Sequence, residues 1–310
     1  MTDLMAHKRG LAAQQSDEHR LRPNFLFLGP DKAGSTWLYT ALRTHSQVYL
    51  PAVKDLFFFD RFYEKGWQWY SGYFKDDREG RRVIGEICHD YLFSTLACQR
   101  IAHDLPNVKL MVCLREPCQR AFSEYLYQVK VGLLACKFEA ALKQVDGLID
   151  RGRYAKHLSC YLQAFHRRQI FVAIFDDLIA DPQKFFDNVC DFLGIDHVCL
   201  SDQLKQKVLP AARPRSRHLA KLMRSAGWGL RQLGFPRIVG KFKDSALLSK
   251  IMYSPYLPNQ KPEISPDTQR YLREIYAPEV RQLDELIEAQ LSHRWGYSPD
   301  VQCERLFASV

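Results

Sequence analysis

The chain has 310 residues, 46% of them hydrophobic, with 44 Lys and Arg against 35 Asp and Glu. This is enough for a sizeable core and excludes a fibrous or fully disordered chain. No window approaches the roughly 18 to 20 uninterrupted apolar residues of a membrane span. Residues 1–22 are polar and lack the apolar core of a signal peptide, so we expect a flexible arm and a single domain over 23–310 in a cytoplasmic protein.

The first predicted strand and helix enclose a glycine loop, Gly29-Pro30-Asp31-Lys32-Ala33-Gly34. Backbone N–H groups at a helix start hold anions, and here Ser35 and Thr36 add hydroxyl donors while Lys32 adds a positive charge. The glycines fit the spacing of G-x-x-x-x-G-K-[ST], but Ser35 stands where that motif has its lysine. The loop therefore predicts a site for a phosphate-like anion, but not a Walker-type site for a Mg-nucleotide. Asp31 would repel an anion, so we expect it to point away.

Strands and helices then alternate along the chain. Hydrophobic patterns predict strands over 25–28, 83–87, 109–114 and 170–175, and helices over 35–45, 95–104, 117–131, 138–148, 154–167 and 182–193. Such alternation implies right-handed crossovers and a parallel sheet covered on both faces. We predict an α/β fold, a P-loop-like three-layer α/β/α sandwich with a central parallel sheet.

A second motif follows the buried strand 109–114, and reads Leu114-Arg115-Glu116-Pro117 with Ser123 further along. Ligands of open α/β sheets collect at the carboxyl ends of the strands. Arg115 at that end and Ser123 on the next helix are placed to bind a second phosphate. The nine cysteines form no C-x-x-C pair, which predicts reduced thiols rather than a disulfide framework or a zinc site.

Together these motifs resemble the sulfotransferases that use 3′-phosphoadenosine 5′-phosphosulfate (PAPS). The run Lys32–Trp37 resembles their 5′-phosphosulfate loop, and 114–125 resembles their 3′-phosphate motif. Segments 51–60, 66–70 and 85–91 resemble the carbohydrate-type and bacterial branches, including the heparan sulfotransferases. The resemblance runs from residue 24 to about 296.

The resemblance implies PAPS as co-substrate and no metal. Lys32 would stabilise charge on the leaving phosphate. The residues implied in nucleotide binding are Lys32, Ala33, Gly34, Ser35, Thr36, Trp37, Arg115, Ser123 and, in a later loop, Arg213, Arg215 and Arg217.

Two residues are candidates for the base that takes the acceptor proton. Asp55 aligns with a glutamate of heparan-type enzymes, and His89 aligns with a histidine of cytosolic-type enzymes. A histidine accepts protons near neutrality, whereas a carboxylate needs burial to become basic. We favour His89 and keep Asp55 as the alternative.

The acceptor is predicted from the family branch to be a hydroxyl of a bacterial glycan, glycolipid or glycosylated natural product, with a small phenol or alcohol as alternative. Lys54, Phe57, Trp67 and Tyr91 are the candidate substrate contacts. The aromatic residues among them suit either sugar stacking or core packing.

The formal net charge of the chain is +9. All of this positive charge comes from residues 205–243, which hold eleven Lys or Arg and no Asp or Glu. The resemblance implies that the loop Arg213–Arg217 of this segment closes over the 3′-phosphate of the nucleotide. The remaining basic face is predicted to face an anionic glycan, an anionic membrane surface or solvent. It lacks the aromatic platform of a nucleic-acid site. A P-loop nucleotide kinase and an inactive nucleotide-binding scaffold remain as alternative functions. No motif in the sequence indicates the oligomeric state.

Overall fold

The computed structural model describes residues 22–74, 80–206, 212–214, 216, 221–226, 229, 253–255 and 262–298. The predicted arm therefore lies, except for Arg22, outside the described residues. Within the described part of the chain, every helix is too short or too polar to cross a bilayer.

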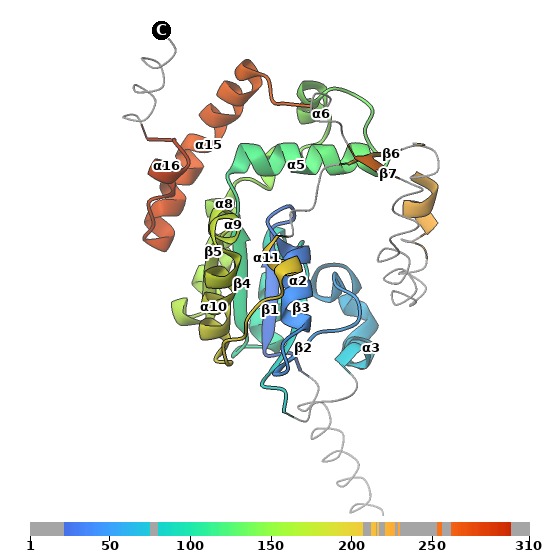
Figure 1. Cartoon of the computed structure of the whole chain (residues 1–310), viewed down its shortest axis with the longest axis vertical. Helices are drawn as coiled ribbons and strands as arrows, with labels where there is room; N and C mark the ends of the chain where they lie inside the picture. The colour runs from blue at the N-terminus through green and yellow to red at the C-terminus, as the bar shows by residue number, and fades with distance from the viewer. Residues whose placement is uncertain are drawn as a thin grey trace, which may run out of the picture.

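A five-stranded parallel sheet forms the centre of the molecule (Figure 1). Its order is β2 (Val48–Tyr49), β3 (Val83–Ile87), β1 (Phe25–Gly29), β4 (Lys109–Leu114) and β5 (Ile170–Ile174). In register, Phe25 lies opposite Gly85 on β3 and Lys109 on β4. The predicted parallel sheet is confirmed, with β1 in the middle.

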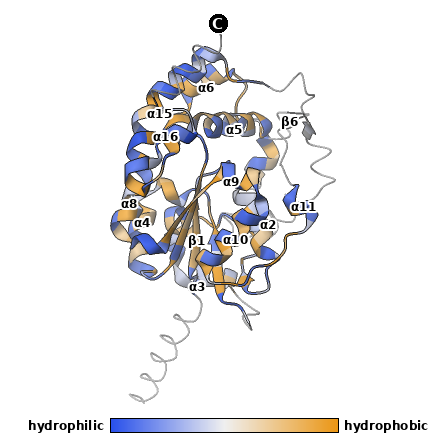
Figure 2. Ribbon diagram, turned by 60° about the vertical axis from the view of Figure 1, so that its left-hand side comes forward, coloured by the Kyte–Doolittle hydropathy of each residue, from blue (hydrophilic) through white to orange (hydrophobic). Residues whose placement is uncertain are grey.

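Alternate residues of the strands face different helices. Phe25, Phe27 and Met111 pack in a cluster with residues of α2 (Ser35–Arg43) and α10 (Pro182–Leu193). Leu26, Leu28 and their neighbours pack in the other cluster with α4 (Thr95–Asp104) and α8 (Tyr154–Ala164). The strands are coloured hydrophobic almost throughout, because both faces of the sheet are covered (Figure 2). The fold is the predicted three-layer α/β/α sandwich.

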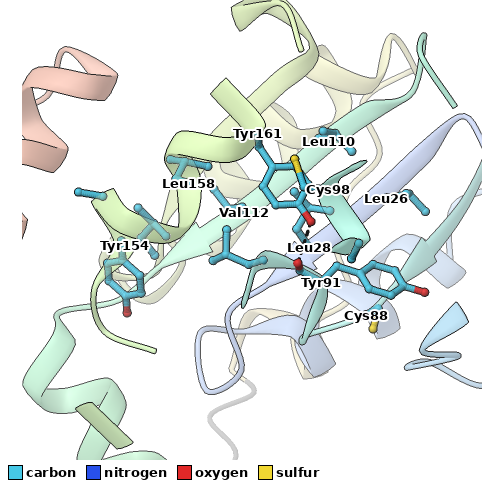
Figure 3. Packing of buried hydrophobic residues seen from close by; sticks show 14 of the residues in the cluster. Leu26, Leu28, Cys88, Tyr91, Cys98, Leu110, Val112, Tyr154, Leu158 and Tyr161 are labelled. Atoms are coloured by element: carbon cyan, nitrogen blue, oxygen red, sulfur yellow. Dashed lines mark hydrogen bonds between the residues drawn. The ribbon is translucent and has the colours of Figure 1, made fainter. Parts of the chain in front are cut away.

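Helix α8 closes one face of this core (Figure 3). Leu158 and Tyr161 of α8 lie over Leu28 and Val112, and the Tyr161 hydroxyl donates to the Tyr91 carbonyl oxygen at 2.7 Å. Because a buried hydroxyl needs a partner, this bond fixes the chain just after β3 against α8.

The remaining elements surround the sheet. Helix α5 (Pro117–Lys130) lies across the upper end of the sheet in Figure 1, next to the loop after β1. Short helices follow the chain: α3 (Gly66–Ser71), α6 (Phe138–Gln144), α7 (Gly147–Asp150), α9 (Phe175–Ala180) and α11 (Asp202–Lys205). The long α15 (Pro266–Ile287) and α16 (Leu291–Arg294) complete the described chain, and β6 (Ala212–Pro214) pairs with β7 (Tyr253–Pro255) in a separate antiparallel sheet.

Several elements differ from the predictions. The predicted helix 35–45 ends at Arg43, and the predicted helix 154–167 ends at Ala164. The predicted helix 138–148 is two helices, because Val145 leaves the helical region (φ −128°, ψ 89°). Strand β2 has only two residues, too few for a hydrophobic pattern. Helix α9 begins directly at Phe175, where the strand was expected to end. The predicted ends of α10 are confirmed, since Asp181 accepts from the Lys184 N–H and Gly194 is left-handed.

Candidate active site

The glycine loop lies at the carboxyl end of the central strand β1, and α2 begins at Ser35. Gly29 has φ +123°, and a Cβ there would lie 2.5 Å from the His89 carbonyl oxygen. Only glycine therefore lets the end of β1 approach the chain after β3 so closely. Ala33 and Ser35 are buried, whereas Thr36 in the first turn of α2 is exposed.

Lys32 is half-buried and has a left-handed backbone (φ 64°). Its Nζ lies 3.8 Å from the centroid of the Tyr127 ring on α5. Burial lowers the pKa of Lys32, and nearby Lys54 and Lys130 lower it further, although Glu124 and Asp31 oppose them. Because an ammonium short of solvent and close to other cations gains from an added anion, this loop favours a negatively charged ligand.

Asp31 is buried and paired with two arginines. Its Oδ1 lies 3.4 Å from Arg120 Nη1 and 3.8 Å from Arg151 Nη1. Burial alone would raise the pKa of Asp31, but a hydrogen bond from Glu124 and the two guanidinium groups hold it well below its usual range. Burial and the Asp31 charge raise the pKa of Glu124 to about 8, so Glu124 is mostly protonated at neutral pH and is the donor in this pair. Asp31 was expected to point away from a bound anion, and in the structure Arg120 and Arg151 neutralise its charge.

Arg115 joins the loop to the end of β4. Its Nη1 donates to the Lys32 carbonyl oxygen at 3.1 Å, and its guanidinium lies 4.8 Å from the centroid of the Phe175 ring. A cleft of about 380 Å³ opens beside it, lined by Arg115, Glu116, Gln119, Phe175, Asp176, Ile179 and Ala180. Ser123 is half-buried one helical turn beyond Gln119, on the same side of α5. The structure thus brings Lys32, Arg115 and the Ser123 face of α5 to one edge of the sheet.

The two candidate bases contact each other. His89 Nδ1 lies 2.7 Å from Asp55 Oδ1, and the Asp55 side chain is only 4% exposed against 26% for His89. Since a carboxylate can only accept, Nδ1 carries a proton in this bond, and Nε2 is the ring nitrogen that remains to face a substrate. The alternatives left open by the sequence therefore form one pair, in which Asp55 orients His89.

Lys54 connects this pair to the loop. Its Nζ donates to Ser35 Oγ at 3.1 Å and lies 3.6 Å from Asp55 Oδ2. Asp55 itself has φ 63°, and its N–H donates to the Ile87 carbonyl oxygen at 2.8 Å, which holds the segment against the end of β3. The candidate base thus lies beside the candidate anion loop.

Residues 22–213 match the sulfotransferase domain. The chain belongs to the sulfotransferase family. It is 30% identical over 205 residues to mouse heparan sulfate glucosamine 3-O-sulfotransferase 6, covering 64% of this chain and 59% of the relative. It is 31% identical over 185 residues to human heparan sulfate glucosamine 3-O-sulfotransferase 3B1, covering 57% of this chain and 47% of that relative. The chain thus spans about half the length of the curated relatives it matches.

The fold is also that of a solved bacterial sulfotransferase. The structure from Alicyclobacillus acidocaldarius superposes with a TM-score of 0.63 at 24% identity, covering 88% of this chain and 98% of the other. Both the predicted family and the predicted fold are confirmed. Among the described residues of this sulfotransferase, no group of three or more His, Cys, Asp or Glu is placed to hold a metal ion.

Two of the predicted substrate contacts, Tyr91 and Trp67, pack with core residues of the sulfotransferase. Tyr91 is fully buried; its hydroxyl lies 3.0 Å from both Glu86 carboxylate oxygens and accepts from the Phe58 N–H. Trp67 packs against Phe58 with ring centroids 5.5 Å apart. Tyr91 is thus enclosed by the core beside η1 (Phe58–Phe62), a short π-helical turn, whereas Trp67 is only partly buried and packs against that core.

Trp37 and Phe57 have different surroundings. Trp37 is 5% exposed, and its Nε1 donates to the Leu204 carbonyl oxygen at 2.8 Å, so its ring belongs to the core below α2 and not to an open nucleotide surface. The Phe57 ring lies edge-on to the His89 ring at 5.6 Å, which places it beside the candidate base. Arg213 lies in β6, and Arg215, Arg217 and most of segment 205–243 lie outside the described residues.

Glu86 is a buried residue that sequence reasoning missed. It accepts from the Tyr70 hydroxyl at 2.6 Å and from the Leu56 N–H at 3.0 Å. Burial raises the pKa of Glu86 to about 8, although these hydrogen bonds act in the opposite direction. By binding the backbone next to Asp55, Glu86 fixes the segment that carries the acidic member of the pair. The only sequence signal was a carboxylate inside an otherwise apolar strand.

Proposed function

We propose that this protein transfers the sulfuryl group of PAPS to a hydroxyl group of an acceptor. One observation carries the proposal: Lys54 joins the His89–Asp55 pair to Ser35 of the anion loop through contacts of 3.1 and 3.6 Å. A group that can take a proton therefore lies beside a group that can hold the leaving phosphate. Family membership agrees with this reading.

The donor would occupy the edge of the sheet between the loop and α5. Lys32, the N–H groups at the start of α2, and the Ser35 and Thr36 hydroxyls would hold the 5′-phosphosulfate. Arg115 and Ser123 would hold the 3′-phosphate, next to the cleft of about 380 Å³. Phe175 lines this cleft and offers an aromatic surface close to Arg115, a contribution that the sequence did not indicate.

The transfer needs a base on one side of the sulfur and a cation on the other. Nε2 of His89 takes the proton of the acceptor hydroxyl while its oxygen attacks the sulfur. The bond between sulfur and the bridging oxygen breaks, and 3′-phosphoadenosine 5′-phosphate (PAP) leaves with the negative charge. Lys32 stabilises that charge as it develops, and Asp55 stabilises the imidazolium formed on His89.

The acceptor is proposed to be a hydroxyl of a glycan, glycolipid or glycosylated natural product. The support comes from the curated relatives, since both of those described above are named heparan sulfate glucosamine 3-O-sulfotransferases. Tyr91 is buried and Trp67 is partly buried, so of the two uses left open for these rings, core packing is favoured over sugar stacking. Recognition of sugars would therefore depend on the charged residues around His89.

Incubation with PAPS carrying a ³⁵S-labelled sulfuryl group tests the proposal. The acceptors are heparan oligosaccharides lacking 3-O-sulfate, a mixed glycolipid fraction and 4-nitrophenol. Label in a sugar-containing product, absent with Lys32→Ala, is the expected result. Label in 4-nitrophenol alone would support sulfuryl transfer from PAPS but contradict the proposal of a sugar-containing acceptor. ATP-dependent phosphorylation instead of sulfation would reject the proposal.

A further inference from the structure

The two ring nitrogens of His89 face different carboxylates. Nδ1 is hydrogen-bonded to Asp55 Oδ1 at 2.7 Å, whereas Nε2 lies 3.5 Å from Asp90 Oδ1. The second distance is at the outer limit for a hydrogen bond, so this contact is chiefly electrostatic. Nε2 is the atom to which the proposed function assigns the acceptor proton, and the state of Asp90 therefore affects the base directly.

Asp90 is 6% exposed and would by itself impair a base at Nε2. A buried carboxylate close to an imidazole favours the protonated ring, because Oδ1 can accept a hydrogen bond from Nε2–H. A histidine held in that form has no lone pair left for the acceptor hydroxyl. Some other group must engage Asp90 if His89 is to stay neutral.

Arg151 binds the same oxygen atom that faces His89. Its Nη1 donates to Asp90 Oδ1 at 2.9 Å, while the other carboxylate oxygen, Oδ2, is paired with Arg61 Nη2. The same Nη1 of Arg151 lies 3.8 Å from Asp31 Oδ1 in the glycine loop. One guanidinium nitrogen therefore lies between the donor loop and the carboxylate next to the base.

The position of Arg151 is fixed by its neighbours. It follows α7 directly, and at the next residue, Gly152, a Cβ would lie 2.7 Å from the Tyr276 ring of α15. The guanidinium also lies 4.7 Å from the centroid of the Phe93 ring. Close packing of the backbone and a cation–π contact thus hold the side chain in one place.

We propose that Arg151 is a positioning residue for the base: by occupying Asp90 Oδ1 it leaves Nε2 of His89 unprotonated, and through Asp31 it ties the base to the donor loop. A second path, Ser35–Lys54–Asp55, reaches Nδ1 from the same loop. The carboxylates that face the two ring nitrogens of His89 are therefore both connected to the glycine loop and the start of α2 through a cation: Asp90 through Arg151, and Asp55 through Lys54. The assignment of His89 as base rests on the proposed function, whereas the effect of Arg151 on His89 does not.

The charged groups around His89 come from five segments. They are Asp31 in the glycine loop, Lys54 and Asp55 in the next loop, Asp60 and Arg61 in η1, and Asp90 and Arg151. Removal of Arg151 increases the excess of carboxylates around the ring, because four carboxylates then face two cations instead of three. Protonation of His89 then becomes more favourable, and the neutral form appears only at higher pH.

The test is an NMR titration of His89 in the full chain labelled with ¹⁵N-histidine. The chain has ten histidines, and His89→Asn identifies the relevant signal by its loss. We expect Arg151→Met to raise the titration midpoint of His89 by about half a unit to one pH unit, so that roughly three to ten times less neutral ring is present on the acidic side. Arg153→Met removes an equal charge two positions away and should leave the midpoint unchanged.

A double-mutant cycle shows whether the effect passes through Asp90. Asp90→Asn should lower the midpoint, and in that background Arg151→Met should shift it by less than half as much as in the wild type. An unchanged midpoint in folded Arg151→Met overturns the inference, as does a full shift in the Asp90→Asn background. If Arg151→Met does not fold, a raised or unchanged midpoint in Asp90→Asn overturns it instead.

The pH dependence of sulfuryl transfer provides the second readout. For Arg151→Met we expect the acidic limb of the rate profile to move upward with the NMR midpoint and the alkaline plateau to be kept. A uniform loss at all pH values would show a structural role and overturn the inference. If the wild type transfers no sulfuryl group, the proposed function fails, and the NMR titration still decides the role of Arg151.

Discussion

Replacing His89 by asparagine tests which member of the His89–Asp55 pair takes the acceptor proton. The asparagine amide can still donate to Asp55 Oδ1, the partner of Nδ1 at 2.7 Å, but it has no basic nitrogen in place of Nε2. General base catalysis contributes about 10²- to 10⁴-fold, so turnover with labelled PAPS should fall by that factor. The side-chain contacts of His89 are to Asp55, Asp90 and Phe57, so affinity for PAP should stay within about twofold.

The cost in stability should be small. One hydrogen bond to a buried carboxylate becomes weaker, which corresponds to about 1 kcal/mol of unfolding free energy in a urea titration. His103→Asn is the matched control, because His103 Nδ1 makes the same kind of pair with Asp104 at 2.8 Å but its side chain is 85% exposed on α4. If His89→Asn keeps more than about a tenth of wild-type turnover, His89 is not the base and Asp55 takes that role.

Three further outcomes follow from the same contacts. Lys32→Ala should lower the turnover rate by about 100-fold or more while weakening PAPS binding far less, since its role lies mainly in the transition state; a variant that binds poorly but turns over normally at saturation would remove that role. Arg115→Ala should cost about 1.5 to 3 kcal/mol of PAP binding and leave AMP binding nearly unchanged in calorimetry, and equal losses for both nucleotides would contradict the 3′-phosphate assignment. The pKa of Glu86, raised to about 8, lies above the unfolded value of about 4.3, so the folded state holds an extra proton between these values and the unfolding free energy falls as pH rises through that window. Glu86→Gln should therefore flatten the decline between about pH 5 and about pH 8 by a few kcal/mol, and an unchanged slope would show that Glu86 is ionised in the fold.

The parts of the site that the sequence predicted are carried by short, local patterns. The loop around Lys32 lies between a buried strand and a helix, and Arg115 follows the next such strand, so chain order alone places both at one edge of a parallel sheet. Asp55 and His89 were identified separately. That they form one hydrogen-bonded pair depends on a left-handed backbone at Asp55, which a non-glycine residue gives no reason to expect.

The parts that the sequence did not predict depend on distant partners. Trp37 looked like a nucleotide contact because its motif suggests one, yet its indole binds the carbonyl of Leu204, far along the chain. Tyr91 is buried because Glu86, a carboxylate inside a strand, needs donors. Arg151 lies outside every motif, and its importance appears only where Asp90 and Asp31 approach it in space.

The most direct test of the account is a calorimetric titration of the full chain with PAP and with AMP. The two ligands differ only in the 3′-phosphate assigned to Arg115 and Ser123. Arg115 and Ser123 would both donate to an ionised phosphate, and these two bonds amount to at least about 2 kcal/mol, so PAP should bind about 30-fold or more tightly than AMP. Comparable affinities for the two nucleotides would contradict the proposed donor site.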